Sequence, residues 1–355
     1  MAPWPQKVQG SPVEMTDDPL AQIRENDPSN LLDDVLAMGD HLRDALWRIS
    51  SAGLEPQEAP MALVCGVGGS GVGGDLAAAA YGDRLTKPLI PVRGYEIPSW
   101  APTDSLVCCS SYSGETEETL ACYAAAEALG APRIAATTGG ALAEAARADG
   151  VPVIGLPGIL QPRAAVAYMF AVASEAARLA GCGPGLHSEI DSAAAHLDER
   201  RDLISRRSRE IAEEIGEATP IVYGSDLTDP IAYRWKCQVN ENALRQCFKS
   251  SLPEADHNEI AGWGEEGGFA AVMLLDSDQH PRERERFALT GEIIAATAGS
   301  PSVVVSESEG ETRTARMFEA VMLGDLVSLQ LAAMAGIDPT PVEAIDELKQ
   351  RLGRP

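Results

Sequence analysis

Short apolar runs alternate with helical segments along most of this chain, and no other feature of the sequence limits the fold as strongly. The run Met61–Cys65, for example, leads through a glycine cluster into an alanine-rich helix that ends near Tyr81. Similar runs recur at 89–92, 105–110, 133–137, 151–154, 220–223, 269–275 and 302–305, with helical patterns between them. Apolar strands separated by helices are typical of parallel sheets covered on both faces. The sequence therefore predicts an α/β protein.

The spacing of these runs divides the chain into two α/β halves, and 355 residues is a length typical of about two domains. Between them, a charged helix over 188–216 alternates acidic and basic side chains, as a solvated connection does. We expect a disordered lead over residues 1–27, an N-terminal half over 28–190 and a C-terminal half over 191–355. The first helix is predicted over 28–52, a long apolar helix over 312–335 and a final helix over 342–352.

Charge and cysteine content narrow the class of protein. The 53 acidic and 28 basic side chains leave a net charge of −25. This balance opposes the basic surface that binds nucleic acids or anionic membranes, so neither is expected as a partner. The most apolar segment, 164–173, is shorter than the roughly 20 residues that span a bilayer. Seven cysteines without a CxxC pair, and dispersed histidines, predict a reducing cytoplasm and neither a disulfide framework nor a metal site.

The segment CGVGGSGVGGD, residues 65–75, lies where the first predicted strand meets its helix. Glycines let the backbone approach an anion, and the amides at a helix N-terminus donate hydrogen bonds to it. Gly66, Gly68 and Gly71 also fit the dinucleotide pattern GxGxxG, but the acidic residue expected after the second strand is not evident. The alternative is a tight turn without a ligand.

A second polar segment, SSYSGETEET, follows the third predicted strand at residues 110–119. Its hydroxyls suit a phosphate monoester, because they donate hydrogen bonds without a cation. Serine and threonine also favour turns and helix caps, so a structural role is the alternative. Because neighbouring parallel strands end at one edge of a sheet, the two segments are expected to converge on one phosphate site. The predicted phosphate-binding residues are Gly69, Ser70, Ser111, Ser113 and Thr116.

The ordered motifs GxGGSxxGGD, SYSGxTxET, QPRA, NEN and PEADHNEI, from about residue 30 onwards, resemble those of the sugar isomerase (SIS) domain. More narrowly, they resemble the bifunctional phosphoglucose/phosphomannose isomerases. The resemblance implies two SIS-type, doubly wound parallel-sheet subdomains of three α/β/α layers, joined by a long helix. It also implies interconversion of glucose 6-phosphate or mannose 6-phosphate with fructose 6-phosphate through a cis-enediolate, without a metal or other cofactor.

The resemblance assigns a role to four side chains. Glu241 matches the base that moves a proton between C2 and C1, and Arg163 matches the group that faces the enediolate. His257 matches the acid–base that opens the sugar ring; in the family it comes from the neighbouring subunit, which implies a homodimer. Lys349 matches a lysine near the ring oxygen. Alternatives from pattern alone are a solvated Glu241, an Arg163 paired with a nearby acid and an exposed Lys349.

The sequence departs from the family pattern at two positions. Glu115 replaces a common asparagine beside the phosphate loop, and we expect it to point to solvent. Leu244 replaces a usual lysine, for which Arg245 is the nearest substitute.

Two other functions remain open. One is a regulatory protein that binds sugar phosphates without catalysis. The second is an NADP-dependent oxidoreductase that uses the glycine turn, with Arg93 near the 2′-phosphate.

Overall fold

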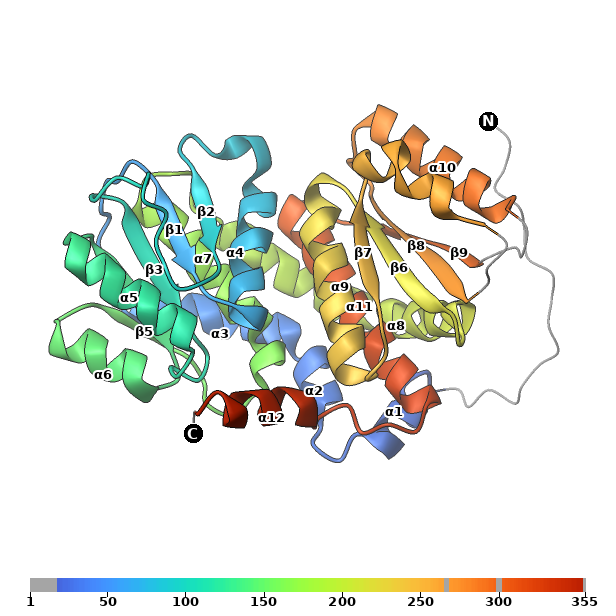
Figure 1. Cartoon of the computed structure of the whole chain (residues 1–355), viewed down its shortest axis with the longest axis horizontal. Coiled ribbons are helices and arrows are strands. Elements are labelled where there is room, and N and C mark those ends of the chain that lie inside the picture. Colours follow the sequence, from blue (N-terminus) through green and yellow to red (C-terminus); the bar gives the residue numbers. More distant parts are fainter. Residues whose placement is uncertain (1–17, 265–267, 298–301, 354–355) are drawn as a thin grey trace.

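The computed structural model describes residues 18–264, 268–297 and 302–353, and it has one parallel sheet in each half, with helices between the two sheets (Figure 1). The strands of the first sheet are fully buried except at its margins, as expected for apolar runs covered on both faces. Its strand order is β2-β1-β3-β4-β5. The strands are β1 (Ala62–Cys65), β2 (Leu89–Val92), β3 (Leu106–Ser110), β4 (Arg133–Thr137) and β5 (Val153–Gly155).

The second sheet has the order β7-β6-β8-β9, and all of its strand pairs are parallel. Its strands are β6 (Thr219–Gly224), β7 (Phe248–Ser251), β8 (Phe269–Asp276) and β9 (Ser302–Ser308). The predicted class of α/β fold with parallel sheets is therefore confirmed. The sequence analysis missed β7, because this edge strand reads FKSS and is half-exposed, so no apolar run marks it.

Helices cover both faces of each sheet. In the N-terminal half they are α2 (Leu31–Leu36), α3 (Met38–Ser51), α4 (Gly68–Tyr81), α5 (Glu117–Leu129), α6 (Gly140–Ala148) and α7 (Val166–Leu179). In the C-terminal half they are α8 (His187–Ile215), α9 (Asp229–Asn242), α10 (Pro281–Ala295), α11 (Arg313–Met334) and α12 (Glu343–Arg351). The described residues also form short 3-10 helices, namely η1 (Gly82–Arg84), η2 (Pro162–Ala165), η3 (Asp226–Thr228), η4 (Glu254–His257) and η5 (Glu259–Gly262).

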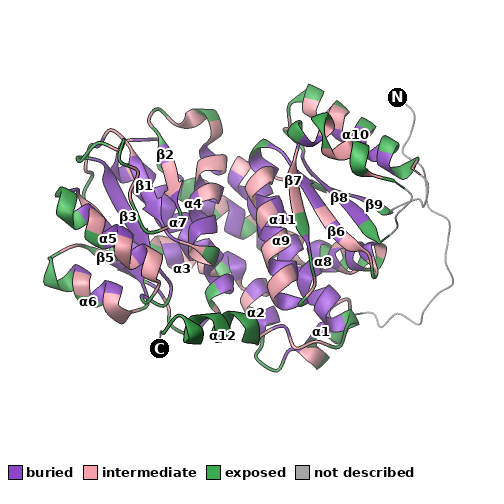
Figure 2. Cartoon of the chain, in the orientation of Figure 1, coloured by how far each residue is buried: buried purple, intermediate pink, exposed green. Residues whose placement is uncertain are grey.

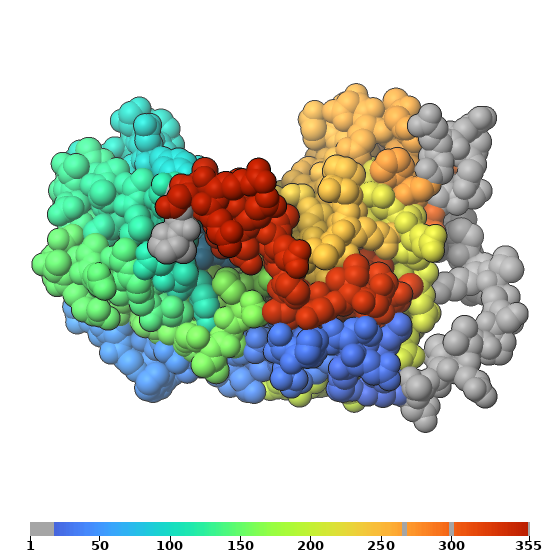
Figure 3. Space-filling view, turned by 60° about the horizontal axis from the view of Figure 1, so that its bottom comes forward, coloured from blue at the N-terminus to red at the C-terminus, as the bar shows by residue number. Residues whose placement is uncertain are grey.

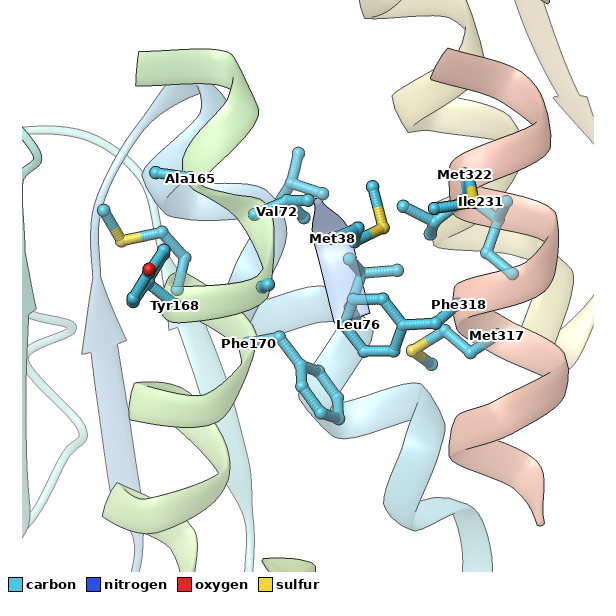
Figure 4. Packing of buried hydrophobic residues seen from close by; sticks show 14 of the residues in the cluster. Met38, Val72, Leu76, Ala165, Tyr168, Phe170, Ile231, Met317, Phe318 and Met322 are labelled. Atoms are coloured by element: carbon cyan, nitrogen blue, oxygen red, sulfur yellow. The ribbon is translucent and has the colours of Figure 1, made fainter. Parts of the chain in front are cut away.

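The largest hydrophobic core runs through both halves, and each sheet has a smaller, separate cluster of buried side chains. Figure 2 shows the buried residues concentrated on the inner sides of α4, α7, α9 and α11. At its centre Phe170 of α7 and Phe318 of α11 meet edge to face, with ring centroids 4.9 Å apart (Figure 4). The boundary predicted between residues 190 and 191 falls inside α8, which continues from one half into the other.

Helix α11 is the only described helix that is long and apolar enough to cross a membrane. Its most apolar window is 94% buried inside the protein, against α8, α9 and α1 (Ala21–Asn26). The same composition is expected of a helix at the centre of a large core. Length and composition are thus explained by burial in the protein.

The prediction of a disordered lead is wrong for residues 18–27, while residues 1–17 lie outside the described part of the chain. Ile23 of α1 is buried in the core, and the side chains of Gln22 and Gln330 tie this segment to α11 through hydrogen bonds to main-chain carbonyls. The predicted single helix over 28–52 is two helices, because the chain leaves helical geometry at Ala37. Residues 18–27 are too few for their sequence alone to predict a helix, and packing against α11 orders them.

Candidate active site

The two polar turns meet at the carboxyl edge of the first sheet. β1 and β3 are neighbours, with Cys65 aligned to Cys109, so the turns that follow them leave the sheet side by side. A Cβ atom on Gly66 would lie 2.9 Å from the carbonyl oxygen of Ser110, which shows how closely the two backbones approach. The structure therefore places the glycine turn against the hydroxyl-rich loop, at the edge where open parallel sheets bind ligands.

The hydroxyls of the second turn differ in their surroundings. Ser111 is buried; its Oγ lies 2.7 Å from Thr116 Oγ1 and accepts a hydrogen bond from the amide of Gly114. Ser113 is exposed, and its Oγ accepts a bond from the amide of Glu115. Ser111 therefore shapes the loop, whereas Ser113 remains at its surface with Thr116 at the start of α5.

Glu115 is exposed, as expected, whereas Arg245 is used elsewhere. The Oε1 atom of Glu115 also accepts a hydrogen bond of 2.9 Å from the amide of Ala141, at the start of α6. That helix N-terminus stabilises the carboxylate. The guanidinium of Arg245 donates to the carbonyls of Gly216 and Ala218 before β6, so it does not replace the missing lysine.

Arg163 lies on η2, directly beside the glycine turn. A Cβ on Gly69 would be 3.2 Å from the carbonyl oxygen of Pro162 and 3.5 Å from Arg163 Cα, so glycine allows this approach. The Arg163 residue is 7% exposed, and its Nη2 donates to the carbonyls of Pro339 and Thr340 at 2.5 and 2.9 Å. Burial lowers the pKa of the guanidinium from its ordinary value, and the nearby Glu241 carboxylate offsets part of this effect.

Glu241 reaches this site from the C-terminal half of the chain. It lies near the end of α9, and its Oε2 is 3.9 Å from Arg163 Nη1. Its side chain is 30% exposed, so the carboxylate faces both a guanidinium and an opening to solvent. The glycine turn, Arg163 and Glu241 thus form a continuous series of neighbours between the two halves. A carboxylate, a fixed cation and an anion-binding turn together can bind a phosphorylated substrate and move a proton.

His257 lies at the carboxyl ends of the strands of the second sheet, whereas Glu241 lies near their amino ends. Because β7 runs parallel to β6, α9 must carry the chain back to the amino edge of the sheet, and Glu241 lies near that end. His257 follows the carboxyl end of β7, at the exposed end of η4. Asp256 fixes this turn by accepting hydrogen bonds from Arg286 and Thr290 of α10. Within one chain, the structure therefore does not bring His257 to Glu241.

Lys349 lies on α12 and is exposed. In Figure 3 this helix, dark red, lies between the N-terminal half in green and cyan and the C-terminal half in yellow and orange. The segment before α12 is anchored to the site by the bonds from Arg163 to Pro339 and Thr340. No hydrogen bond or ion pair joins Lys349 to Arg163 or Glu241 within the described ranges.

The sequence analysis missed a buried ion pair beneath the site, formed by Arg234 of α9 and Asp325 of α11. Two signals were present in the sequence. Arg234 lies two helical turns before Glu241, on the same side of α9, and Asp325 interrupts a long apolar helix. An acid inside such a helix requires a buried partner. Among the described residues, no group of three or more histidine, cysteine or acidic side chains is arranged to hold a metal ion.

Comparison with known proteins shows the family to which the chain belongs. Residues 204–352 match the family described as the bacterial phospho-glucose isomerase C-terminal SIS domain. The bifunctional phosphoglucose/phosphomannose isomerase of Caldicellulosiruptor bescii is 37% identical over 317 residues, which cover 85% of this chain and 92% of that protein. The enzyme of the same name from Aquifex aeolicus is 34% identical over 294 residues, covering 82% of this chain and 89% of that protein.

A solved structure shows the same fold at low sequence identity. The C-terminal domain of glucosamine-fructose-6-phosphate aminotransferase from Francisella tularensis superposes with a TM-score of 0.65 and 14% identity, covering 88% of this chain and 98% of that chain. The predicted pair of SIS-type sheets is therefore confirmed as the fold. With relatives of this identity and coverage, the chain belongs to the family of bifunctional phosphoglucose/phosphomannose isomerases.

Proposed function

We propose that this protein is an aldose–ketose isomerase that interconverts glucose 6-phosphate and mannose 6-phosphate with fructose 6-phosphate. The observation that carries the proposal is the 3.9 Å separation of Arg163 Nη1 and Glu241 Oε2, beside the glycine turn that Gly69 brings against Arg163. The names of its relatives support the same reaction class. A cytoplasmic location is part of the proposal, since all seven cysteines are free thiols.

The phosphate is held by the amides at the start of α4, with Gly69 and Ser70, and by the hydroxyls of Ser113 and Thr116. The sugar carbons then extend towards Glu241. Its carboxylate removes the proton from C2 of the open-chain aldose and returns it to C1, while the hydroxyl proton at O2 passes to O1. The negative charge that develops on O1 faces the Arg163 guanidinium, which suits a delocalised oxyanion. This series of proton transfers needs no metal.

The same intermediate accounts for two substrates. Glucose 6-phosphate and mannose 6-phosphate differ only in configuration at C2, and the enediolate makes this carbon planar. A site that tolerates rotation about the C2–C3 bond returns the proton to either face and yields both epimers. Thr340 lies beside Arg163 at the entrance to α12, where it contributes to this tolerance. We place Lys349 near the ring oxygen when substrate is bound.

Ring opening requires His257, and we propose that a second copy of the chain supplies it. The argument is geometric: Glu241 and His257 lie near opposite edges of the second sheet, and His257 is exposed. Imidazole titrates near neutral pH and can protonate the ring oxygen as the anomeric bond opens. The working unit is then a homodimer in which each site combines Glu241 of one chain with His257 of the other.

Direct assay tests the function. The purified protein is incubated with fructose 6-phosphate in EDTA, and glucose 6-phosphate and mannose 6-phosphate are each measured enzymatically. We expect both products to form at rates that EDTA does not change. Saturable binding of fructose 6-phosphate without turnover would instead establish the regulatory alternative.

Mixing two inactive variants tests the shared site. Glu241→Gln and His257→Asn homodimers are each expected to be inactive in ring-closed glucose 6-phosphate turnover. After the subunits are exchanged at random, heterodimers contain one site with both native side chains, and about a quarter of wild-type activity returns. If His257 acted within its own chain, no mixture would regain activity. Unmixed samples carried through the same exchange conditions serve as controls.

Ser70→Ala tests the phosphate turn. Ser70 lies in the first turn of α4, and loss of its hydroxyl removes a hydrogen bond that is equally strong in the ground and transition states. We expect KM for fructose 6-phosphate to rise about 10-fold with kcat nearly unchanged. Ser50→Ala, at an exposed position of α3, is the control and leaves both constants unaltered. A large fall in kcat with KM constant would contradict a role in phosphate binding.

A further inference from the structure

A buried ion pair lies directly behind the candidate site. Arg234 of α9 donates from Nε to Asp325 Oδ1 at 2.9 Å and from Nη2 to Oδ2 at 2.6 Å. The two side chains are only 2% and 1% exposed. This two-point geometry holds the guanidinium in one plane and one direction.

A third bond directs Arg234 towards Arg163. Nη2 of Arg234 also donates to the main-chain carbonyl of Arg163, at 3.0 Å. This bond crosses from the C-terminal half to η2 in the N-terminal half. The helix that carries Arg234 also carries Glu241, about 10 Å further along its axis. One helix therefore holds both the backbone of Arg163 and the carboxylate that faces the Arg163 side chain.

Asp325 makes this arrangement electrostatically possible. Two guanidinium groups buried close together repel, and the charge of Arg234 contributes to lowering the pKa of Arg163. The carboxylate of Asp325 balances Arg234, so that Arg234 can be buried beside the Arg163 backbone. The bond to η2 links this pair to the backbone of Arg163, whereas an ion pair that served stability alone would gain little from burial.

We propose that Arg234, held in place by Asp325, is a positioning residue that sets the separation between Arg163 and Glu241. The inference rests on the proposed isomerase function. Arg234 does not touch the substrate in this arrangement. It acts through Arg163, whose guanidinium must lie where charge develops on the enediolate oxygen.

Arg234→Lys tests the proposal, because lysine keeps the charge but has one ammonium group for three acceptors. We expect kcat with fructose 6-phosphate to fall about 10- to 100-fold, as small misplacements of a catalytic group do, with a much smaller change in KM. The control is Arg316→Lys. Arg316 is similarly buried and pairs with Asp276, but at the carboxyl edge of the second sheet. The Arg316→Lys variant should leave kcat unchanged even if it lowers the stability of the protein as much as Arg234→Lys does.

A double-mutant cycle separates positioning from general damage. If Arg234 acts through Arg163, then Arg234→Lys lowers kcat less than about 3-fold in an Arg163→Lys background, whereas independent effects multiply. Asp325→Asn is the second variant: it removes the negative charge and leaves one side-chain oxygen instead of two for Arg234, and it should show the same fall and the same coupling. The inference is overturned if the effects of Arg234→Lys and Asp325→Asn on kcat each multiply fully with the effect of Arg163→Lys. It is also overturned if a folded Arg234→Lys protein has the wild-type kcat. Absence of turnover in the wild-type protein would instead overturn the proposed function.

Discussion

Glu241→Gln is expected to remove nearly all isomerase activity while leaving the fold intact. The amide occupies the same volume but cannot accept the proton from C2, and a positioned acid–base group contributes about 100- to 10,000-fold to such steps. We therefore expect kcat to fall by about this factor, with KM for fructose 6-phosphate little changed, because the substitution leaves the proposed phosphate-binding turns of the first sheet intact. Coupled assays of both aldose phosphates measure the loss.

Solvent isotope exchange gives a second measurement of the same change. In deuterated water the wild-type protein should incorporate deuterium at C1 of fructose 6-phosphate, because the proton on Glu241 exchanges before it is returned. The Glu241→Gln variant should incorporate none. Glu127→Gln, at an exposed position of α5, is the control and should exchange at the wild-type rate. Turnover at the wild-type rate in Glu241→Gln would refute the assigned base.

Gly324→Ala is expected to destabilise the protein strongly, although alanine normally strengthens a helix by about 1 kcal/mol over glycine. Gly324 lies in α11 against the ring of Trp235, and an added Cβ would fall 2.0 Å from Nε1 and 2.2 Å from Cδ1. The ring cannot easily move: it is 1% exposed, and its Nε1 donates to the carbonyl of Ala320. We expect unfolding free energy to fall by about 3 kcal/mol.

Urea unfolding followed by circular dichroism measures this effect. Gly155→Ala is the control, since a Cβ there meets no atom within 4 Å and its backbone lies outside the left-handed region. Its midpoint should match that of the wild-type protein. Because Trp235 adjoins Arg234 on α9, the Gly324→Ala protein should also lose activity under conditions in which it remains folded. A urea midpoint of Gly324→Ala equal to or above the wild-type value would contradict this prediction, because it would show that α9 and α11 separate easily.

Local patterns predicted most of the fold. Apolar runs such as Leu106–Ser110 form strands in any context that buries both faces, so the strands of the first sheet were located closely. The predictions failed for β7 and for α1 for the same reason. β7 is a polar edge strand, and α1 is a short helix that α11 orders, so in both cases the stabilising contacts come from residues distant in sequence.

For the candidate site, the motifs identified which residues to examine but not all of their surroundings. Gly69, Ser70 and the 111–116 loop converge because the order of parallel strands makes β1 and β3 neighbours. Glu115 faces solvent, as expected, but the sequence did not indicate that it also accepts a hydrogen bond from the start of α6. Its partner, Ala141, is 26 residues away, and no local signal indicates such a contact.

The order and character of neighbouring side chains determined most strands and helices and the two polar turns, because these features depend on contacts within a few residues. Tertiary structure decided the rest. It placed Glu241 against Arg163, fixed Arg234 behind both and left His257 near the far edge of its sheet. Those positions follow from how α9 packs on α11 and η2, and that packing depends on the burial of side chains from both halves in one shared core.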